Sequence, residues 1–140
     1  MSETLRAFVR ERATKNCEYC YSSDDFSPSP YCVEHIIPLV KAGETEPDNL
    51  AWACQGCNGR KYIFTEATDP YTGLEVPLYH PRKDKWVEHF AWNEDFSLMI
   101  GRTPVGRATI ERLDLNRREV VNLCIILTEA GLHPPVVAEG

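Results

Sequence analysis

Two short segments decide how this chain folds: Cys17-Glu18-Tyr19-Cys20 and Cys54-Gln55-Gly56-Cys57. Each segment is a zinc knuckle in pattern, because it places two cysteines three positions apart, and together the two knuckles supply four thiolates. Four thiolates close a tetrahedral shell and leave no position for water, so the predicted metal site is structural. The sequence therefore predicts one structural Zn²⁺ that joins the two knuckles across the residues between them.

Polar side chains of another kind lie between and beside the knuckles: Glu34-His35, Asn49 and Asn58. A structural zinc site needs none of them. Hydrolysis of a phosphodiester, however, needs a base that deprotonates water and a cation that neutralises developing charge. We therefore predict His35 as the base, with Glu34 and Asn58 as oxygen ligands of Mg²⁺ or Mn²⁺. Adjacent residues of a regular strand point to opposite faces, so Glu34 and His35 can share one site only where the backbone bends.

The chain resembles the HNH endonuclease family in its zinc-bound, Cys-x-x-Cys form. The resemblance covers residues 17–61 and rests on three segments: Val33-Glu34-His35-Ile36-Ile37-Pro38, Asp48-Asn49-Leu50 and Cys57-Asn58-Gly59-Arg60-Lys61. It implies a DNA substrate, products with 5′-phosphate and 3′-hydroxyl ends, and an Asn49 that holds the hairpin loop and so orients His35. Residues 79–135 are similar, more loosely, to the tail of stand-alone bacterial members.

Two features depart from or extend the family pattern. The family often has Asp or His at the position of Glu34, and His at the position of Asn58; a Glu/Asn pair favours Mg²⁺ or Mn²⁺ over transition metals. After Asn58, Arg60 and Lys61 are predicted to contact nucleic-acid phosphates, although Lys61 could equally be a solvated helix residue.

Local patterns predict an α+β fold. Apolar spacing predicts a helix over residues 3–13, with Ser2 as N-cap. Two strands over 31–38 and 50–53, then a helix from Asn58 to about Ala67, would form the ββα-metal (HNH) core. Further along, we predict a surface connection over 69–81, a loop over 101–106 and a hairpin of residues 88–92 and 96–100. A final helix follows, capped by Asn116 with Glu119 in a capping box.

These elements predict one domain over residues 1–140. The HNH core with its structural zinc, bound by all four knuckle cysteines, would span residues 17–67. An N-terminal helix precedes it, and a C-terminal hairpin-plus-helix extension over 79–135 would pack on it.

Composition limits the classes of function. The net charge of −6 argues mildly against a protein that binds nucleic acid along a long surface. No apolar run approaches the roughly 18 residues of a membrane span, and the charged N-terminus has no signal-peptide pattern, so we expect a cytoplasmic protein. In a reducing compartment paired cysteines indicate metal or redox chemistry, and Cys32 and Cys124 are then free thiols.

The sequence leaves other functions open. A catalytically silent zinc module that binds nucleic acid or a protein partner is the main alternative, and a thiol redox protein is a weaker one. No separate recognition domain is visible, so we expect low specificity or a protein partner that provides specificity. We assign no role to three further histidines, and we expect the tryptophans to pack in the core or hairpin. These residues are His80, His89, His133, Trp52, Trp86 and Trp92.

Overall fold

A computed structural model describes residues 1–135 of the chain, which divides into two compact units. Unit 1 is Met1–Thr65, and unit 2 begins at Glu66. The boundary lies inside the helix that the sequence predicted over residues 58–67. The packing of a C-terminal extension on the zinc-containing core stays a prediction.

Unit 1 opens with helix α1 (Glu3–Arg12), close to the predicted span. Ser2 caps it as predicted, because its hydroxyl oxygen accepts a hydrogen bond from the backbone N–H of Leu5 at 3.1 Å. At the other end, the Arg12 guanidinium donates to two backbone carbonyls and ties α1 to the chain that enters the second strand. These carbonyls belong to Pro47 and Leu50.

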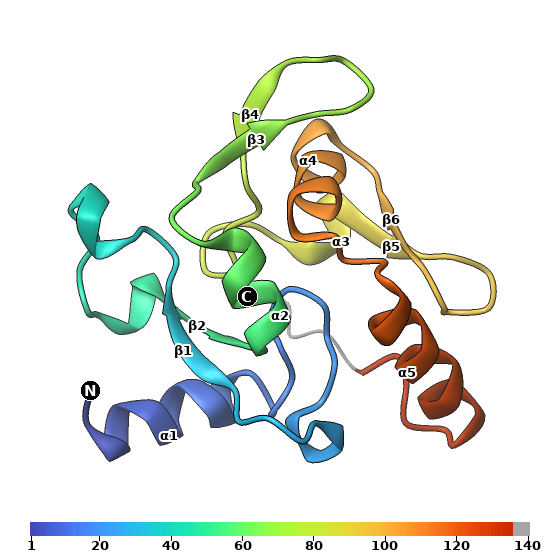
Figure 1. Ribbon diagram of the computed structural model, residues 1–140, viewed down its shortest axis with the longest axis horizontal. Coiled ribbons are helices and arrows are strands. Elements are labelled where there is room, and N and C mark those ends of the chain that lie inside the picture. Colours follow the sequence, from blue (N-terminus) through green and yellow to red (C-terminus); the bar gives the residue numbers. More distant parts are fainter. Residues whose placement is uncertain (136–140) are drawn as a thin grey trace. The chain divides into compact units, whose positions relative to one another are not determined.

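The strands β1 (Cys32–His35) and β2 (Leu50–Ala53) form an antiparallel hairpin (Figure 1). Their register sets Cys32 opposite Ala53 and His35 opposite Leu50. Every residue of β2 is buried, so this strand is the centre of unit 1. β1 ends at His35 instead of 38, since Pro38 starts a 3₁₀ turn, η2 (Leu39–Lys41). A second turn, η3 (Pro47–Asn49), leads into β2.

Helix α2 (Gln55–Lys61) follows β2 directly and completes a ββα arrangement (Figure 1). It begins three residues earlier than predicted, because the Cys54 sulfur acts as N-cap and accepts from the Cys57 N–H at 3.4 Å. It also ends earlier, because Tyr62 takes a positive φ of 49°, which a continuing helix does not allow. The second knuckle is therefore the first turn of the helix.

Unit 2 contains two small hairpins. The first, β3 (Glu66–Thr68) with β4 (Glu75–Pro77), was not predicted; its residues had been assigned to the end of a helix and a surface connection. A short helix, α3 (Trp86–His89), leads into the second, β5 (Phe90–Trp92) with β6 (Met99–Gly101). This second hairpin confirms the predicted pairing, with slightly shifted ends.

Two longer helices complete unit 2: α4 (Pro104–Leu113) and α5 (Arg118–Glu129). α4 was not predicted, although Thr103 caps it and Pro104 occupies its first turn, both common helix-start residues. The capping role predicted for Asn116 is wrong. Its carboxamide instead bonds the backbone N–H and carbonyl of Met99, and α5 starts without a side-chain cap bond.

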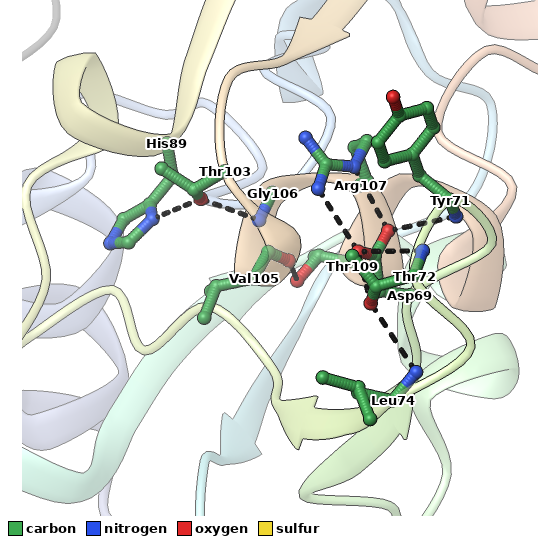
Figure 2. A network of polar contacts seen from close by, with 10 residues as sticks. All are labelled: Asp69, Tyr71, Thr72, Leu74, His89, Thr103, Val105, Gly106, Arg107 and Thr109. Atoms are coloured by element: carbon green, nitrogen blue, oxygen red, sulfur yellow. Dashed lines mark hydrogen bonds and ion pairs between the residues drawn. The ribbon is translucent and has the colours of Figure 1, made fainter.

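A polar network ties the β3–β4 hairpin to α4 (Figure 2). The fully buried Asp69 carboxylate receives two hydrogen bonds from the Arg107 guanidinium, at 2.9 and 3.0 Å. It also accepts from the backbone N–H groups of Tyr71 and Thr72, which closes the hairpin turn. The ion pair thus joins the turn of the β3–β4 hairpin to α4. None of the helices described over residues 1–135 is long and apolar enough to cross a membrane.

Candidate active site

The four knuckle cysteines converge on one point inside unit 1. Their sulfur atoms all lie within 4.8 Å of one another, and the Cys20 and Cys54 sulfurs are 3.8 Å apart. Four sulfurs bound to one Zn²⁺ at about 2.3 Å would lie about 3.8 Å apart on a tetrahedron, so the spacing fits zinc. All four cysteines are buried. Their arrangement supports the prediction of a closed, structural metal site.

Backbone N–H groups hydrogen-bond to a sulfur of this cluster. The N–H groups of Tyr19 and Cys20 point at the Cys17 sulfur, at 3.5 and 3.4 Å. The pKa of Cys54 is held well below its ordinary value, chiefly because the Cys17 thiol, followed by the other two, hydrogen-bonds to its sulfur. Burial, in contrast, raises the pKa of Cys17 well above its ordinary value. A thiolate is the form that binds metal, so a bound cation is what would bring all four cysteines to the ligand state.

Glu34 lies on the buried face of β1, only 5% exposed, and each of its carboxylate oxygens has a close polar neighbour. One oxygen is 2.6 Å from the ammonium of Lys61, and the other accepts from the Tyr19 hydroxyl at 2.6 Å. Burial raises the pKa of this carboxyl group, while Lys61 and Tyr19 act in the opposite direction. The same ammonium donates to the Ile36 carbonyl at 2.8 Å. Glu34 thus links the first knuckle, β1 and the end of α2.

This pair bears on two predictions. Lys61 is 1% exposed, so the alternative that it is a solvated helix residue is wrong. Its ammonium compensates the buried Glu34 carboxylate, and the predicted contact with nucleic-acid phosphates would require Lys61 to leave this pair. For Glu34, a divalent cation would have to replace the Lys61 ammonium at the carboxylate. The donor type suits a hard cation, but the structure already supplies a positive charge there.

His35 ends β1 and is partly exposed. The strand is regular through the His35–Leu50 pair, so the His35 and Glu34 side chains leave it on opposite faces. The Nε2 atom of His35 lies 2.8 Å from the hydroxyl oxygen of Thr45, a residue of the connection between β1 and β2. The ring is therefore held at one nitrogen.

Asn49 holds the connection between the strands closed, as predicted. Its carboxamide oxygen accepts from the Ile37 N–H at 2.8 Å, and its nitrogen donates to the Ile37 and Glu44 carbonyls at 3.0 and 2.8 Å. Gly43 is required here, because a Cβ at this position would meet the Ile37 carbonyl oxygen at 1.8 Å. The loop is thus built to one shape; a contribution of Asn49 to catalysis stays a prediction.

Asn58 and Arg60 lie on α2. Asn58 is one helical turn before Lys61 on the same face and is partly exposed. Within residues 1–135 its carboxamide has no hydrogen-bond partner, which leaves its oxygen available to a ligand. Arg60 is exposed and bonds only its own helix, at the Gly56 carbonyl. Of the two basic residues predicted to meet phosphate, Arg60 is the one at the surface.

Sequence reasoning missed Tyr19 and Thr45. Tyr19 lies within the first knuckle, between two cysteines, and no pattern marks it as a partner of Glu34. Thr45 lies in a turn-rich loop and belongs to no motif. Among the residues described, the four cysteines are the one group of three or more His, Cys, Asp or Glu side chains that could hold a metal ion. Cys32 and Cys124 lie outside it.

The remaining histidines and tryptophans pack as expected or serve turns. Trp52 and Trp86 are buried, and Trp92 stacks edge-on against His133 with ring centroids 4.6 Å apart. His80 accepts from backbone N–H groups of its own turn, and the Nδ1 of His89 bonds the Thr103 hydroxyl. These contacts are structural, in keeping with the absence of any predicted role for the three histidines.

Comparison with known proteins agrees with this geometry. Residues 17–62 match the model of the HNH endonuclease family, described as "HNH endonuclease". No curated protein and no solved structure matched the chain. The matched segment begins at the first cysteine of the cluster and ends one residue after α2, so it contains the hairpin, the loop closed by Asn49 and both knuckles. The segment of residues 17–62 is therefore similar to the HNH endonuclease family by sequence, and its ββα arrangement and four-cysteine cluster are consistent with a zinc-bound HNH fold.

Proposed function

We propose that unit 1 hydrolyses phosphodiester bonds of DNA, with His35 as the general base. The observation that carries the proposal is the placement of His35. It lies at the end of β1, partly exposed, with one ring nitrogen held by Thr45 and beside a loop that Asn49 closes. An imidazole held at one nitrogen keeps its other nitrogen for proton abstraction, the usual role of a catalytic histidine.

In the proposed reaction, His35 removes a proton from water as the water oxygen attacks phosphorus. The bond between phosphorus and the 3′ oxygen breaks, and a proton returns to that oxygen. The products carry a 5′-phosphate and a 3′-hydroxyl. Arg60, at the surface of α2, is proposed to pair with a neighbouring phosphate of the DNA strand.

Mg²⁺ or Mn²⁺ is proposed as cofactor, held by the carboxylate of Glu34 and the carboxamide of Asn58. A bound cation would supply charge neutralisation at the scissile phosphate. The donor set fits in type, since one carboxylate and one free carboxamide are oxygen ligands of a hard cation. It requires that Lys61 withdraw from Glu34. It also requires that β1 bend at its end, because the Glu34 and His35 side chains leave the regular strand on opposite faces. Binding is therefore expected to be weak and to need cation in excess.

The Glu34–Lys61 pair also favours a second candidate function. If the carboxylate stays neutralised from within, unit 1 is a zinc module that binds nucleic acid or a protein without cutting. The net charge of −6 is consistent with this alternative, because it weakens non-specific attraction to DNA. A protein partner that provides specificity is compatible with the same net charge.

Cleavage of supercoiled plasmid by purified protein with Mg²⁺ or Mn²⁺ separates the two functions. We expect cleavage by the wild type and a loss of about 10²-fold or more in His35→Ala. His89→Gln, in unit 2, is the matched control and should cut at the wild-type rate. Absence of cleavage with any divalent cation, while the protein retains zinc and binds DNA, would favour the silent module.

A further inference from the structure

Thr45 is the one side chain that bonds the His35 ring among residues 1–135. The Nε2 atom of His35 and the hydroxyl oxygen of Thr45 are 2.8 Å apart, a normal hydrogen-bond length. The two residues are ten positions apart and belong to different elements, so the contact depends on the path of the loop between them.

The loop brings Thr45 to His35 through its own hydrogen bonds. The Asn49 carboxamide nitrogen donates to the carbonyl of Glu44, the residue directly before Thr45, at 2.8 Å. The same carboxamide bonds the N–H and carbonyl of Ile37, two residues after His35. Asn49 therefore joins the loop positions next to Thr45 and His35, which keeps the hydroxyl at the ring.

We propose that Thr45 is the positioning residue of His35: its hydroxyl oxygen accepts a hydrogen bond from the Nε2–H, so that Nδ1 carries the lone pair that takes the proton. The inference rests on the proposed function of His35 as base. The direction of the bond follows from the chemistry of the cycle. Both ring nitrogens donate in the imidazolium form, so a bond in which Thr45 accepts persists before and after proton transfer. A bond in which Thr45 donated to Nε2 would place the proton on Nδ1 and would break on protonation.

The tautomer of His35 can be read by long-range ¹H–¹⁵N NMR on protein labelled with ¹⁵N-histidine, at a pH at which the ¹⁵N shifts themselves report a neutral ring. The variants are Thr45→Val, which removes the hydroxyl at nearly constant shape, and Thr45→Ser, which keeps it. Thr65→Val is the control, because no hydrogen bond of the Thr65 hydroxyl is found within residues 1–135. We expect the Nε2–H form in the wild type, Thr45→Ser and Thr65→Val, and a mixture of tautomers in Thr45→Val.

Steady-state cleavage by the same proteins provides the second readout. Loss of a group that orients a functional imidazole costs on the order of 10- to 100-fold, so kcat of Thr45→Val should fall by that factor with KM unchanged. Thr45→Ser should restore most of it. An Nε2–H tautomer that persists in Thr45→Val, an unchanged kcat in that variant, or a Thr45→Ser that behaves like Thr45→Val would overturn the proposal. If the wild type does not cut DNA, the proposed function fails, and the tautomer alone decides the role of Thr45.

Discussion

Unit 1 and unit 2 are similar in length but differ in what holds them together. Unit 1 buries four cysteines and an internal ion pair, Glu34 with Lys61. Unit 2 packs aromatic side chains such as Trp86 and Phe90. Among its described residues it has one buried carboxylate, Asp69, paired with a partly exposed arginine. In unit 1 the groups that make the fold also surround the candidate site. In unit 2 the polar network joins a hairpin turn to a helix, and none of the predicted site residues lies there.

This difference predicts which substitutions should affect the candidate site. We use the word frame for the four-cysteine cluster together with the Glu34–Lys61 pair. A substitution that weakens this frame should also change the position of His35, because His35 directly follows Glu34 on β1. A comparable substitution in unit 2 should change the stability of unit 2, where no predicted site residue lies.

The largest effect is expected from removal of zinc. Structural zinc contributes about 10–16 kcal/mol of apparent binding free energy in small zinc domains, more than unit 1 can replace. A strong chelator, or Cys57→Ser, should therefore unfold unit 1. The indole N–H signal of Trp52 reports on unit 1, and those of Trp86 and Trp92 report on unit 2. We expect the Trp52 signal to move to its unfolded position while the Trp86 and Trp92 signals keep their shifts. Loss of all three signals together would show that unit 2 also depends on the zinc site.

Lys61→Met should have the next largest effect. It leaves the Glu34 carboxylate buried without its counter-charge, which typically costs about 3–5 kcal/mol of unfolding free energy. The double variant with Glu34→Gln should recover much of that loss, since the two residues are in contact. Arg60→Met, one position earlier on the exposed side of α2, is the control and should change stability by less than about 0.5 kcal/mol. Denaturant unfolding of zinc-loaded protein measures all of these free energies. A Lys61→Met variant that loses less than about 1 kcal/mol would show that the ion pair does not stabilise unit 1.

Acid should affect unit 2 through Asp69. Hydrogen bonding from Arg107 is the main reason why the pKa of this carboxyl group lies well below its ordinary value. The folded form therefore binds the proton less tightly than the unfolded form, so the stabilisation is present above about pH 4 and is lost as the pH falls toward the folded pKa. Asp69→Asn should remove this pH dependence and lower the melting temperature of unit 2 by about 5 °C or more. The Trp86 signal can follow the stability of unit 2 as the pH falls. If Asp69→Asn loses stability in acid as the wild type does, other carboxylates cause the effect.

The smallest effects concern one helix cap in each unit. Ser2→Ala removes the cap of α1, and Thr103→Ala removes the cap of α4. Both should cost about 0.5–2 kcal/mol. Thr103→Ala should lie at the upper end, because the Thr103 hydroxyl also bonds the Nδ1 of His89. Equal costs in thermal or denaturant unfolding would show that this second bond adds nothing.

Much of unit 1 could be predicted because its signals are local and chemically specific. Cysteine spacing predicted the cluster, the Ser2 cap predicted the start of α1, and the carboxamide of Asn49 holds the loop as expected. The ion pair between Glu34 and Lys61 could not be predicted, because it depends on which face of β1 meets α2. Thr45 was missed for a similar reason: its contact with His35 exists only through the path of the closed loop.

Unit 2 was harder to predict because its elements are short and depend on tertiary contacts. The β3–β4 hairpin has three residues on each side. Asp69, which closes its turn, is bound by Arg107, a residue far away in sequence. The start of α4 was visible in Thr103 and Pro104 but was obscured by the glycines on either side. Asn116 looked like a helix cap, yet its carboxamide serves β6 instead.

The central claim is that the four-cysteine cluster forms the frame of unit 1 while His35 performs the chemistry within it. The most direct test measures zinc content and plasmid cleavage on the same preparations of wild type and His35→Ala. We predict about one zinc ion per chain in both proteins, as four thiolates bind one tetrahedral ion, and cleavage by the wild type alone. Cleavage at the wild-type rate by a zinc-loaded His35→Ala, or loss of zinc from that variant, would contradict the account.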